Sequence, residues 1–240
     1  MTSAAQLLSE QDHRDTWSLT IGKDMSDEDI EFVREAGAKL RELSQRYRAA
    51  LREVVRFEIL DQDLNLRKDR TPIHHVESRV KTPESIIEKI GRYGKERTLE
   101  NIEKYIMDIA GIRVICSYIS DVYNLFDLLQ RQDDLEIVTV KDYIANPKPN
   151  GYRSYHLIIE IPVFFSEEKK NLRVEVQIRT IAMDFWASLD HQLKYKKDIG
   201  AAADEISEDL RQCAEVIAAT DQHMLQIRKS IEEQSTKQHK

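Results

Sequence analysis

The apolar run from Ile109 to Cys116 restricts the fold more than any other segment, because it has the composition of an interior β-strand. It reads Ile-Ala-Gly-Ile-Arg-Val-Ile-Cys, and short runs rich in β-branched residues are typical of strands buried on both faces. A buried strand needs other strands beside it and helices over it. Arg113 is the one charge within the run, and Asp108 directly precedes it, so both need partners if the strand is buried.

The segments on either side alternate between strand and helix patterns. Thr82-Pro83, for example, is an N-cap followed by proline at the first helical position. Strands are expected at 73–80, 135–141, 154–162 and 172–179, the last two as a hairpin, and helices at 83–91, 98–107, 121–130 and 181–196. The prediction is an α/β (α+β) fold, with a mixed sheet of about five strands surrounded by helices.

Two long helices are expected at the ends of the chain. Apolar or small residues recur at steps of three and four from Ile30 to Val54 and from Ile206 to Ile231, which marks one face of a helix in each case. Residues 61–72 are polar and end in a proline, so they are predicted to form a loop. The predicted divisions are a polar, loosely ordered N-terminus at 1–25, an N-terminal helix at 26–60, a central domain at 61–199 and a C-terminal helical extension at 200–240.

Composition excludes some classes of protein. The net charge is −7, from 36 basic and 43 acidic residues, whereas a protein that coats nucleic acid without specificity is usually basic. The two cysteines, Cys116 and Cys213, make no disulfide framework and favour a reducing cytoplasm. No segment approaches the roughly 20 apolar residues that cross a bilayer. We therefore expect a soluble, cytoplasmic protein with no membrane partner and no obligatory nucleic acid.

A first group of candidate residues lies where the strand at 73–80 meets the next helix. Arg79 and Lys81 are two apart near the strand end, and Lys89 and Arg92 are three apart on one helix face. The free N–H groups of the helix N-terminus, where Ser85 lies, also attract anions. Four converging cations would bind a polyphosphate, and the alternative is an ordinary solvated basic face.

A second group carries the carboxylates. The run from Glu175 to Arg179 alternates, which places Glu175, Gln177 and Arg179 on one face of a strand. If this strand lies near Asp108, the two carboxylates can hold one Mg²⁺ ion together with ATP phosphate oxygens. The alternatives are an ion pair between Asp108 and Arg113 and a solvated hairpin face.

A third group combines a loop with the start of a helix. The loop mixes aromatic rings with cations, as suits a stacked base and its phosphates, and the alternative is a plain surface loop. On the helix, Asp184 can accept hydrogen bonds from guanine N1–H and N2–H₂ together, and the alternative is a helix N-terminal charge. The loop residues concerned are Lys141, Lys148, Asn150, Gly151, Tyr152, Arg153, Tyr155 and His156.

The order of these groups resembles the synthetase domain of the RelA/SpoT family, and specifically its small alarmone synthetases. The resemblance covers the central domain, and the helical flanks of the family fit both ends of the chain. The stretches that carry it are 71–81, 108–116, 141–144, 149–156 and 174–186.

The resemblance implies a nucleotidyltransferase-like sheet and a Mg²⁺-dependent transfer of pyrophosphate from ATP to the 3′-hydroxyl of GDP, GTP or GMP, which yields (p)ppGpp and AMP. It implies that Asp108 and Glu175 are catalytic metal ligands and that Glu175 is also the general base. The implied ATP-binding residues are Arg79 and Arg113 around adenine, with Lys81, Ser85, Lys89 and Arg92 at the phosphates. The implied guanosine-nucleotide residues are Tyr152, stacked on guanine, and Lys141, Lys148, Asn150, Arg153, His156, Gln177, Arg179 and Asp184.

Because helices 83–91, 121–130 and 181–196 already cover the sheet, the apolar stripes of the terminal helices predict a homo-oligomer with these helices at its interfaces, and the resemblance suggests a tetramer. The alternative is that both helices pack within one subunit. Since the chain contains no His-Asp dipeptide, we expect synthesis without the hydrolase activity of longer family members. Three alternatives stay open: a pyrophosphotransferase for another acceptor, such as an adenosine nucleotide or a tRNA end; a non-catalytic sensor of guanosine phosphates; and a scaffold whose helices do the work.

Overall fold

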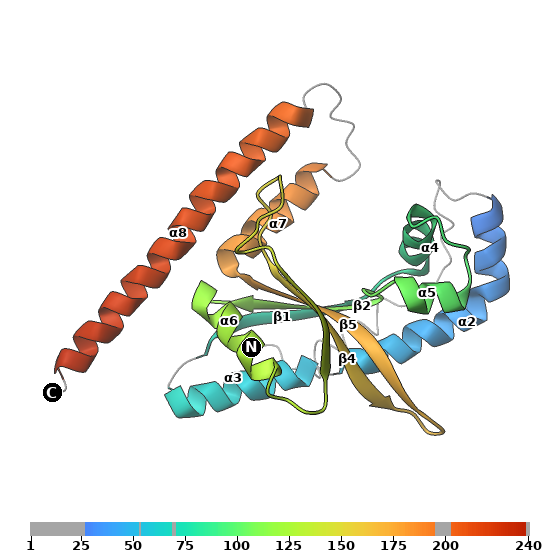
Figure 1. Cartoon of the computed structure of the whole chain (residues 1–240), viewed down its shortest axis with the longest axis horizontal. Helices are drawn as coiled ribbons and strands as arrows, with labels where there is room; N and C mark the ends of the chain where they lie inside the picture. The colour runs from blue at the N-terminus through green and yellow to red at the C-terminus, as the bar shows by residue number, and fades with distance from the viewer. Residues whose placement is uncertain (1–26, 53, 69–70, 195–202, 239–240) are drawn as a thin grey trace.

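The computed structural model describes residues 27–52, 54–68, 71–194 and 203–238, and within them five strands form one mixed sheet (Figure 1). This confirms the predicted fold class. The strand order is β1-β2-β5-β4-β3; β2 and β5 are parallel, and the other neighbours are antiparallel. The strands are β1 (Ile73–Val80), β2 (Ala110–Cys116), β3 (Glu136–Asp142), β4 (Tyr155–Phe164) and β5 (Lys169–Thr180).

The helices follow the predicted order, with one error near the N-terminus. Their bounds are α2 (Asp27–Leu51), α3 (Val54–Lys68), α4 (Pro83–Arg92), α5 (Leu99–Tyr105), α6 (Ile119–Leu129), α7 (Ile181–Lys194) and α8 (Ala203–Gln238). The expected single helix at 26–60 is two helices, and the loop predicted for 61–72 is wrong because α3 continues to Lys68. The predicted loose segment at 1–25 lies outside the described residues.

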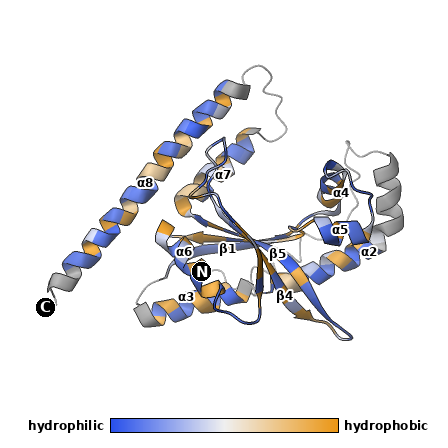
Figure 2. Ribbon diagram, viewed as in Figure 1, coloured by the Kyte–Doolittle hydropathy of each residue, from blue (hydrophilic) through white to orange (hydrophobic). Residues whose placement is uncertain are grey.

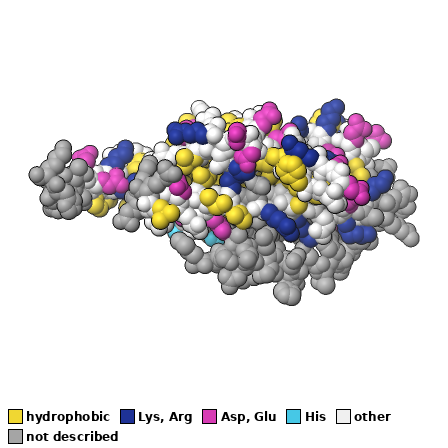
Figure 3. All heavy atoms as spheres, turned by 90° about the horizontal axis from the view of Figure 1, so that it is seen from below, with side chains coloured by type: hydrophobic (Ala, Val, Ile, Leu, Met, Phe, Trp, Pro, Cys, Tyr) yellow, Lys and Arg dark blue, Asp and Glu magenta, His cyan; other side chains and the backbone are white. Residues whose placement is uncertain are grey.

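Polar residues of α3 face solvent or hold the next strand, which explains the error. Asp61 Oδ1 accepts a hydrogen bond of 2.9 Å from Ile73 N–H at the start of β1. A polar composition therefore belongs here to a surface helix. On its outer side α3 leaves Ile59 and Leu66 exposed, and hydrophobic side chains are visible among charged ones on the face of the molecule seen from below (Figure 3).

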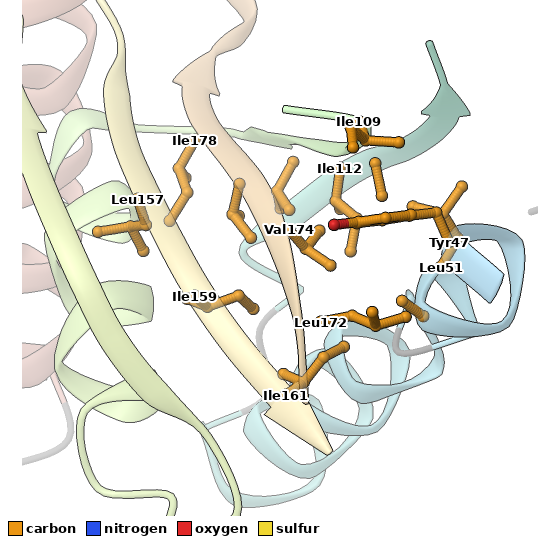
Figure 4. Packing of buried hydrophobic residues seen from close by; sticks show 14 of the residues in the cluster. Tyr47, Leu51, Ile109, Ile112, Leu157, Ile159, Ile161, Leu172, Val174 and Ile178 are labelled. Atoms are coloured by element: carbon orange, nitrogen blue, oxygen red, sulfur yellow. The ribbon is translucent and has the colours of Figure 1, made fainter. Parts of the chain in front are cut away.

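The core lies between α2 and one face of the sheet. Leu40, Tyr47 and Leu51 are at most 3% exposed, and Tyr47 and Leu51 pack beside Ile112 and Val174 of the central strands (Figure 4). This confirms the apolar stripe predicted for the N-terminal helix over the part whose side chains are described. Burial of such side chains stabilises the fold by about 1.5–3 kcal/mol each, so α2 fixes the sheet from below in Figure 1.

The long helix α8 packs on α7 and α6 with only one side. Trp186 Nε1 donates to Leu210 O at 2.9 Å, and Thr180 Oγ1, which also accepts from an N–H in the first turn of α7, donates to Asp221 Oδ2 at 2.6 Å. Hydrophilic and hydrophobic residues alternate along α8 (Figure 2). Ile227, which belongs to the predicted apolar stripe, is 43% exposed, and Val216 is 67% exposed. Within the described residues, no helix is both long and apolar enough to cross a membrane.

Candidate functional site

Strand register brings the predicted site residues into two rows on the polar face of the sheet, opposite α2. One row runs through Glu77 on β1, Arg113 on β2, Gln177 on β5, His156 on β4 and Lys141 on β3. These residues are partners across neighbouring strands, so their side chains leave the same face. Segments more than 60 residues apart in the sequence therefore meet at one surface.

The second row contains the acidic centre. Arg79 pairs with Gly111, and Gly111 pairs with Glu175 on β5. Gly111 has no side chain there, and an added Cβ would find its nearest heavy atoms, Arg79 Cγ and Glu175 O, only at 4.0 Å. A cavity of about 60 Å³ lies over this glycine; its lining includes Arg79, Asp108, Arg113, Glu175 and Gln177.

Asp108 lies two residues before β2, lines this cavity and meets two lysines. Lys89 Nζ of α4 lies 2.8 Å from its Oδ2, and Lys81 Nζ lies 3.2 Å from the same oxygen. Lys81 is placed by its backbone N–H, which donates to Ile109 O at 2.7 Å, and α4 is started by Thr82, whose hydroxyl accepts from Ser85 N–H. The alternative of an Asp108–Arg113 ion pair is wrong, since Asp108 contacts these lysines instead.

Glu175 is held ionised by its neighbours. Burial alone would raise the pKa of this carboxyl, but the hydrogen bond and charge of His156, with smaller effects of Gln177 and Lys89, lower it to about 2. Gln177 Nε2 donates to Oε2 at 2.7 Å, and His156 Nδ1 lies 3.4 Å from Oε1. The carboxylate therefore carries a full negative charge throughout the neutral pH range.

A chain of hydrogen bonds links Glu175 to the loop before β4. Arg179 Nη2 donates to Tyr152 Oη at 2.6 Å, and Tyr152 Oη lies 2.8 Å from His156 Nε2. If the imidazole is neutral, the Tyr152 hydroxyl donates to Nε2, so the ring proton is on Nδ1 and faces Glu175. If the imidazole is cationic, Nδ1 carries a proton as well. The chain thus fixes both rings relative to the carboxylate.

The larger cavity, of about 710 Å³, continues from the first toward α7. Its lining includes Arg79, Arg113, Tyr152, Gln177 and Arg179 together with the side chains of α7. The first and second cavities share Arg79, Arg113 and Gln177. Two ligands can therefore lie side by side, one near the lysines and one near Tyr152.

Some predicted residues have other partners. Arg92 is exposed, contacts Glu88 at 3.7 Å and lines neither cavity. Ser85 belongs to the helix cap, and Asp184 contacts Arg179 at 3.1 Å and Arg113 at 3.7 Å. Arg153 points toward α8.

Sequence reasoning missed several lining residues. On α7, Ser188, Asp190, His191 and Gln192 line the larger cavity. The helical spacing of Ser188 and His191 after Asp184 could have predicted that they share its side of the helix. Tyr143, an aromatic residue two positions after Lys141, was also missed; it lines neither cavity but lies close to Lys148. The Lys148 Nζ atom lies 4.8 Å from the ring centroids of both Tyr143 and Tyr152.

The donor set suits a divalent cation that shares its ligands with a substrate. The Oδ1 atom of Asp108 is buried and has no hydrogen-bond partner among the described residues, and Glu175 is anionic in the same cavity. In the part of the chain that is described, no three His, Cys, Asp or Glu side chains form a complete metal cage. Mg²⁺ is commonly held by only one or two carboxylates plus substrate phosphates, so these residues fit that ion.

The chain belongs to the RelA/SpoT family. Residues 78–200 match the family described as "Region found in RelA / SpoT proteins", and this segment includes Asp108 and Glu175. The resemblance stated from the motifs is thereby confirmed.

Among its relatives are two proteins of Bacillus subtilis (strain 168). The chain is 48% identical to GTP pyrophosphokinase YwaC over 177 residues, which cover 74% of this chain and 84% of that protein. It is 36% identical to GTP pyrophosphokinase YjbM over 188 residues, or 78% and 87% of the two chains.

The fold also matches solved structures of small alarmone synthetases. Small alarmone synthetase 2 from Bacillus subtilis matches with a TM-score of 0.70 and 44% identity, covering 79% of this chain and 98% of that one. Small alarmone synthetase 1 from the same organism, bound to its product pppGpp, matches with a TM-score of 0.73 and 34% identity over 81% and 99% of the chains.

Proposed function

We propose that this protein is a GTP pyrophosphokinase that transfers the β,γ-pyrophosphoryl group of ATP to the 3′-hydroxyl of GTP or GDP, as part of the stringent response. The observation that carries the proposal is the meeting of Asp108 and Glu175 in one cavity lined by Arg79 and Arg113, with Lys81 and Lys89 at Asp108. Phosphoryl transfer depends mainly on positioning and charge neutralisation, and this arrangement supplies both.

ATP takes the side of the site next to α4. Its adenine lies against the guanidinium groups of Arg79 and Arg113, and its phosphates displace the ammonium groups of Lys81 and Lys89 from Asp108. The two lysines then neutralise phosphate charge, and the carboxylate of Asp108 becomes available for a metal ion. Arg92 acts only at longer range, since its side chain is 67% exposed.

The guanosine nucleotide takes the larger cavity near Tyr152. The ring of Tyr152 stacks on guanine, Asp184 accepts from the guanine edge, and Lys148 and Lys141 supply positive charge toward the 5′-phosphates. Asn150 fixes the loop, because its Oδ1 accepts from Tyr152 N–H at 3.3 Å. The acceptor ribose then lies between Tyr152 and the acidic centre.

Asp108 and Glu175 would hold a Mg²⁺ ion, which when bound supplies charge neutralisation and orientation of the ATP phosphate oxygens. In the transfer, a bond forms between the acceptor O3′ and the β-phosphorus, the bond from the β-phosphorus to the oxygen of the α-phosphate breaks, and AMP leaves. The hydroxyl proton passes to Glu175. A carboxylate with a pKa of about 2 is a weak base, so this proton moves late, as a loose transition state permits.

Substitution of the two carboxylates tests the proposal. Asp108→Asn and Glu175→Gln should each reduce turnover at least about 100-fold while ATP still binds. Glu160→Gln is the matched control, because Glu160 contacts Arg173 at 3.2 Å and lines neither cavity. Turnover above about a tenth of wild type in both site variants would remove these residues from the mechanism.

The proposal includes a homo-oligomer, with a tetramer as the expected form, in the cytoplasm, where both nucleotides are available. The exposed apolar side of α8, which carries Val216 and Ile227, is the proposed interface, because an uncovered apolar row is a liability in a monomer. Val216→Glu with Ile227→Glu should reduce the mass measured by light scattering. Gln222→Glu with Gln226→Glu, on a polar side of the same helix, should not. A mass near that of the 28.1 kDa single chain for the wild type would contradict the assembly.

A further inference from the structure

The loop that precedes β4 lies directly on helix α8, backbone against helix. Gly151 is buried and has φ 85°, and an added Cβ would come within 2.5 Å of Ala214 Cβ and 3.3 Å of Arg211 Cα. The loop closes on itself through Gly151 N–H, which donates to Lys148 O at 2.8 Å. The position of the loop on α8 therefore depends on the small side chain of Ala214.

Arg153 joins the same loop to α8 from the other side. Its Nη1 donates to Gly151 O at 3.1 Å and to Ala214 O at 3.4 Å, and its Nη2 lies 3.1 Å from both carboxylate oxygens of Glu215. The Arg153 side chain is 13% exposed, and Arg153 is absent from the lining of both nucleotide cavities. This places the side chain in a clamp between loop and helix, whereas the sequence suggested a nucleotide contact.

Tyr152 lies between these two anchored residues. It lines the larger cavity and bonds to Arg179 and His156, while Gly151 and Arg153 on either side are held by α8. Its ring centroid is 6.4 Å from that of Trp186, whose indole N–H donates to α8. A shift of α8 would therefore move the ring that faces the acceptor.

We propose that Glu215 and Ala214 of α8 are positioning residues for the acceptor nucleotide, and that Arg153 serves them as the clamp rather than binding the nucleotide itself. The inference rests on the proposed assignment of the Tyr152 loop to the acceptor. Exposed ion pairs usually contribute little, and Glu215 is 53% exposed. This pair differs because the Arg153 side chain is largely buried, contacts both carboxylate oxygens of Glu215 and also donates to the carbonyls of Gly151 and Ala214.

Charge reversal gives opposite predictions for positioning and for simple electrostatics. The acceptor is a polyanion, so replacing a nearby carboxylate by an ammonium should lower its KM if only long-range charge matters. Positioning predicts the reverse: Glu215→Lys should raise the acceptor KM about tenfold by breaking a charge-assisted clamp, with the ATP KM within about twofold. Glu215→Gln keeps one acceptor oxygen and should fall between.

The matched control is Glu208→Lys, the same charge change on the same helix. Among the described residues, Glu208 accepts hydrogen bonds from Arg211 and Gln212, which belong to α8 itself, so the acceptor KM should stay within about twofold or fall slightly. Hydrogen exchange on the apo protein gives a readout apart from activity, since the amides of Lys148 and Gly151 should exchange faster in Glu215→Lys.

Two results would overturn the inference. An acceptor KM in Glu215→Lys that is unchanged or lower, while Tyr152→Ala raises it, would show that the loop binds the acceptor without the clamp. If Tyr152→Ala also leaves the acceptor KM unchanged, the assignment of the loop to the acceptor fails, and the inference fails with it.

Discussion

Replacement of Gly151 by alanine separates backbone strain from the contact between loop and helix. A residue with a side chain at φ 85° loses roughly 1–2 kcal/mol in a left-handed conformation. The new Cβ would also stand 2.5 Å from Ala214 Cβ, whereas carbon atoms in contact lie about 3.5–4.0 Å apart. Loop and helix must therefore separate by roughly 1 Å, and overpacking of this kind costs about 1–3 kcal/mol more.

The expected result is a loss of acceptor affinity, because the loop can relieve the clash by leaving α8. Steady-state kinetics should show an acceptor KM at least about tenfold higher, which corresponds to about 1.4 kcal/mol, with a nearly unchanged ATP KM. Gly94→Ala is the control: Gly94 has φ 62° and nothing within 4 Å of an added Cβ. It should lower thermal stability through strain and leave the acceptor KM unchanged.

A second substitution separates the effect of the steric clash on acceptor affinity from the effect of backbone strain. Ala214→Gly in the Gly151→Ala background removes the clashing methyl group and leaves the backbone strain, so part of the acceptor affinity should return. The reasoning is refuted if Gly151→Ala has the acceptor KM of the wild type, or if Gly94→Ala raises that KM equally.

Three further predictions concern the ATP side, α8 and the core. Lys89→Ala removes the 2.8 Å contact to Asp108 and a positive charge that neutralises the ATP phosphates, so the ATP KM should rise about tenfold in steady-state assays. A rise confined to the acceptor KM would show that the two nucleotide pockets are assigned the wrong way round. Burial raises the pKa of the Asp221 carboxyl, so its ionised form costs stability at neutral pH, and Asp221→Asn should raise the Tm at pH 7. That advantage should shrink as the pH falls through the raised pKa, since the wild-type group then becomes neutral; a growing advantage in acid would contradict the sign. Ile159→Ala, at 1% exposure, should lower the unfolding free energy by about 2–5 kcal/mol in urea titrations, whereas Ile59→Ala, at 59%, should change it by less than about 0.5 kcal/mol.

The sequence predicts the sheet well because its strands carry strong local signals. The apolar run that ends at Cys116 and the alternating run around Glu175 are both strands in the structure. Alternation along β5 correctly places Glu175, Gln177 and Arg179 on one face of the sheet. The polar helix ending at Lys68 was misread because composition alone does not separate a surface helix from a loop.

The direction of individual charged side chains could not be predicted. Arg153 lies among nucleotide candidates in the sequence, yet its partner Glu215 is 62 residues away. In the same way, Asp108 meets Lys81 and Lys89 because the chain that leaves β1 for α4 bonds to the segment before β2, where Lys81 N–H donates to Ile109 O. Such pairings depend on tertiary packing, which periodicity does not encode.

The most direct test of the central claim is to identify the product. The purified chain is incubated with ATP, Mg²⁺ and either GDP or GTP, and the nucleotides are separated by anion exchange and examined by phosphorus NMR. We predict equal amounts of AMP and a guanosine nucleotide with a pyrophosphate on its 3′-oxygen, transfer at least about 100-fold slower with Asp108→Asn, and no loss of that pyrophosphate on further incubation. Release of ADP or inorganic phosphate without a 3′-modified guanosine product would contradict the account.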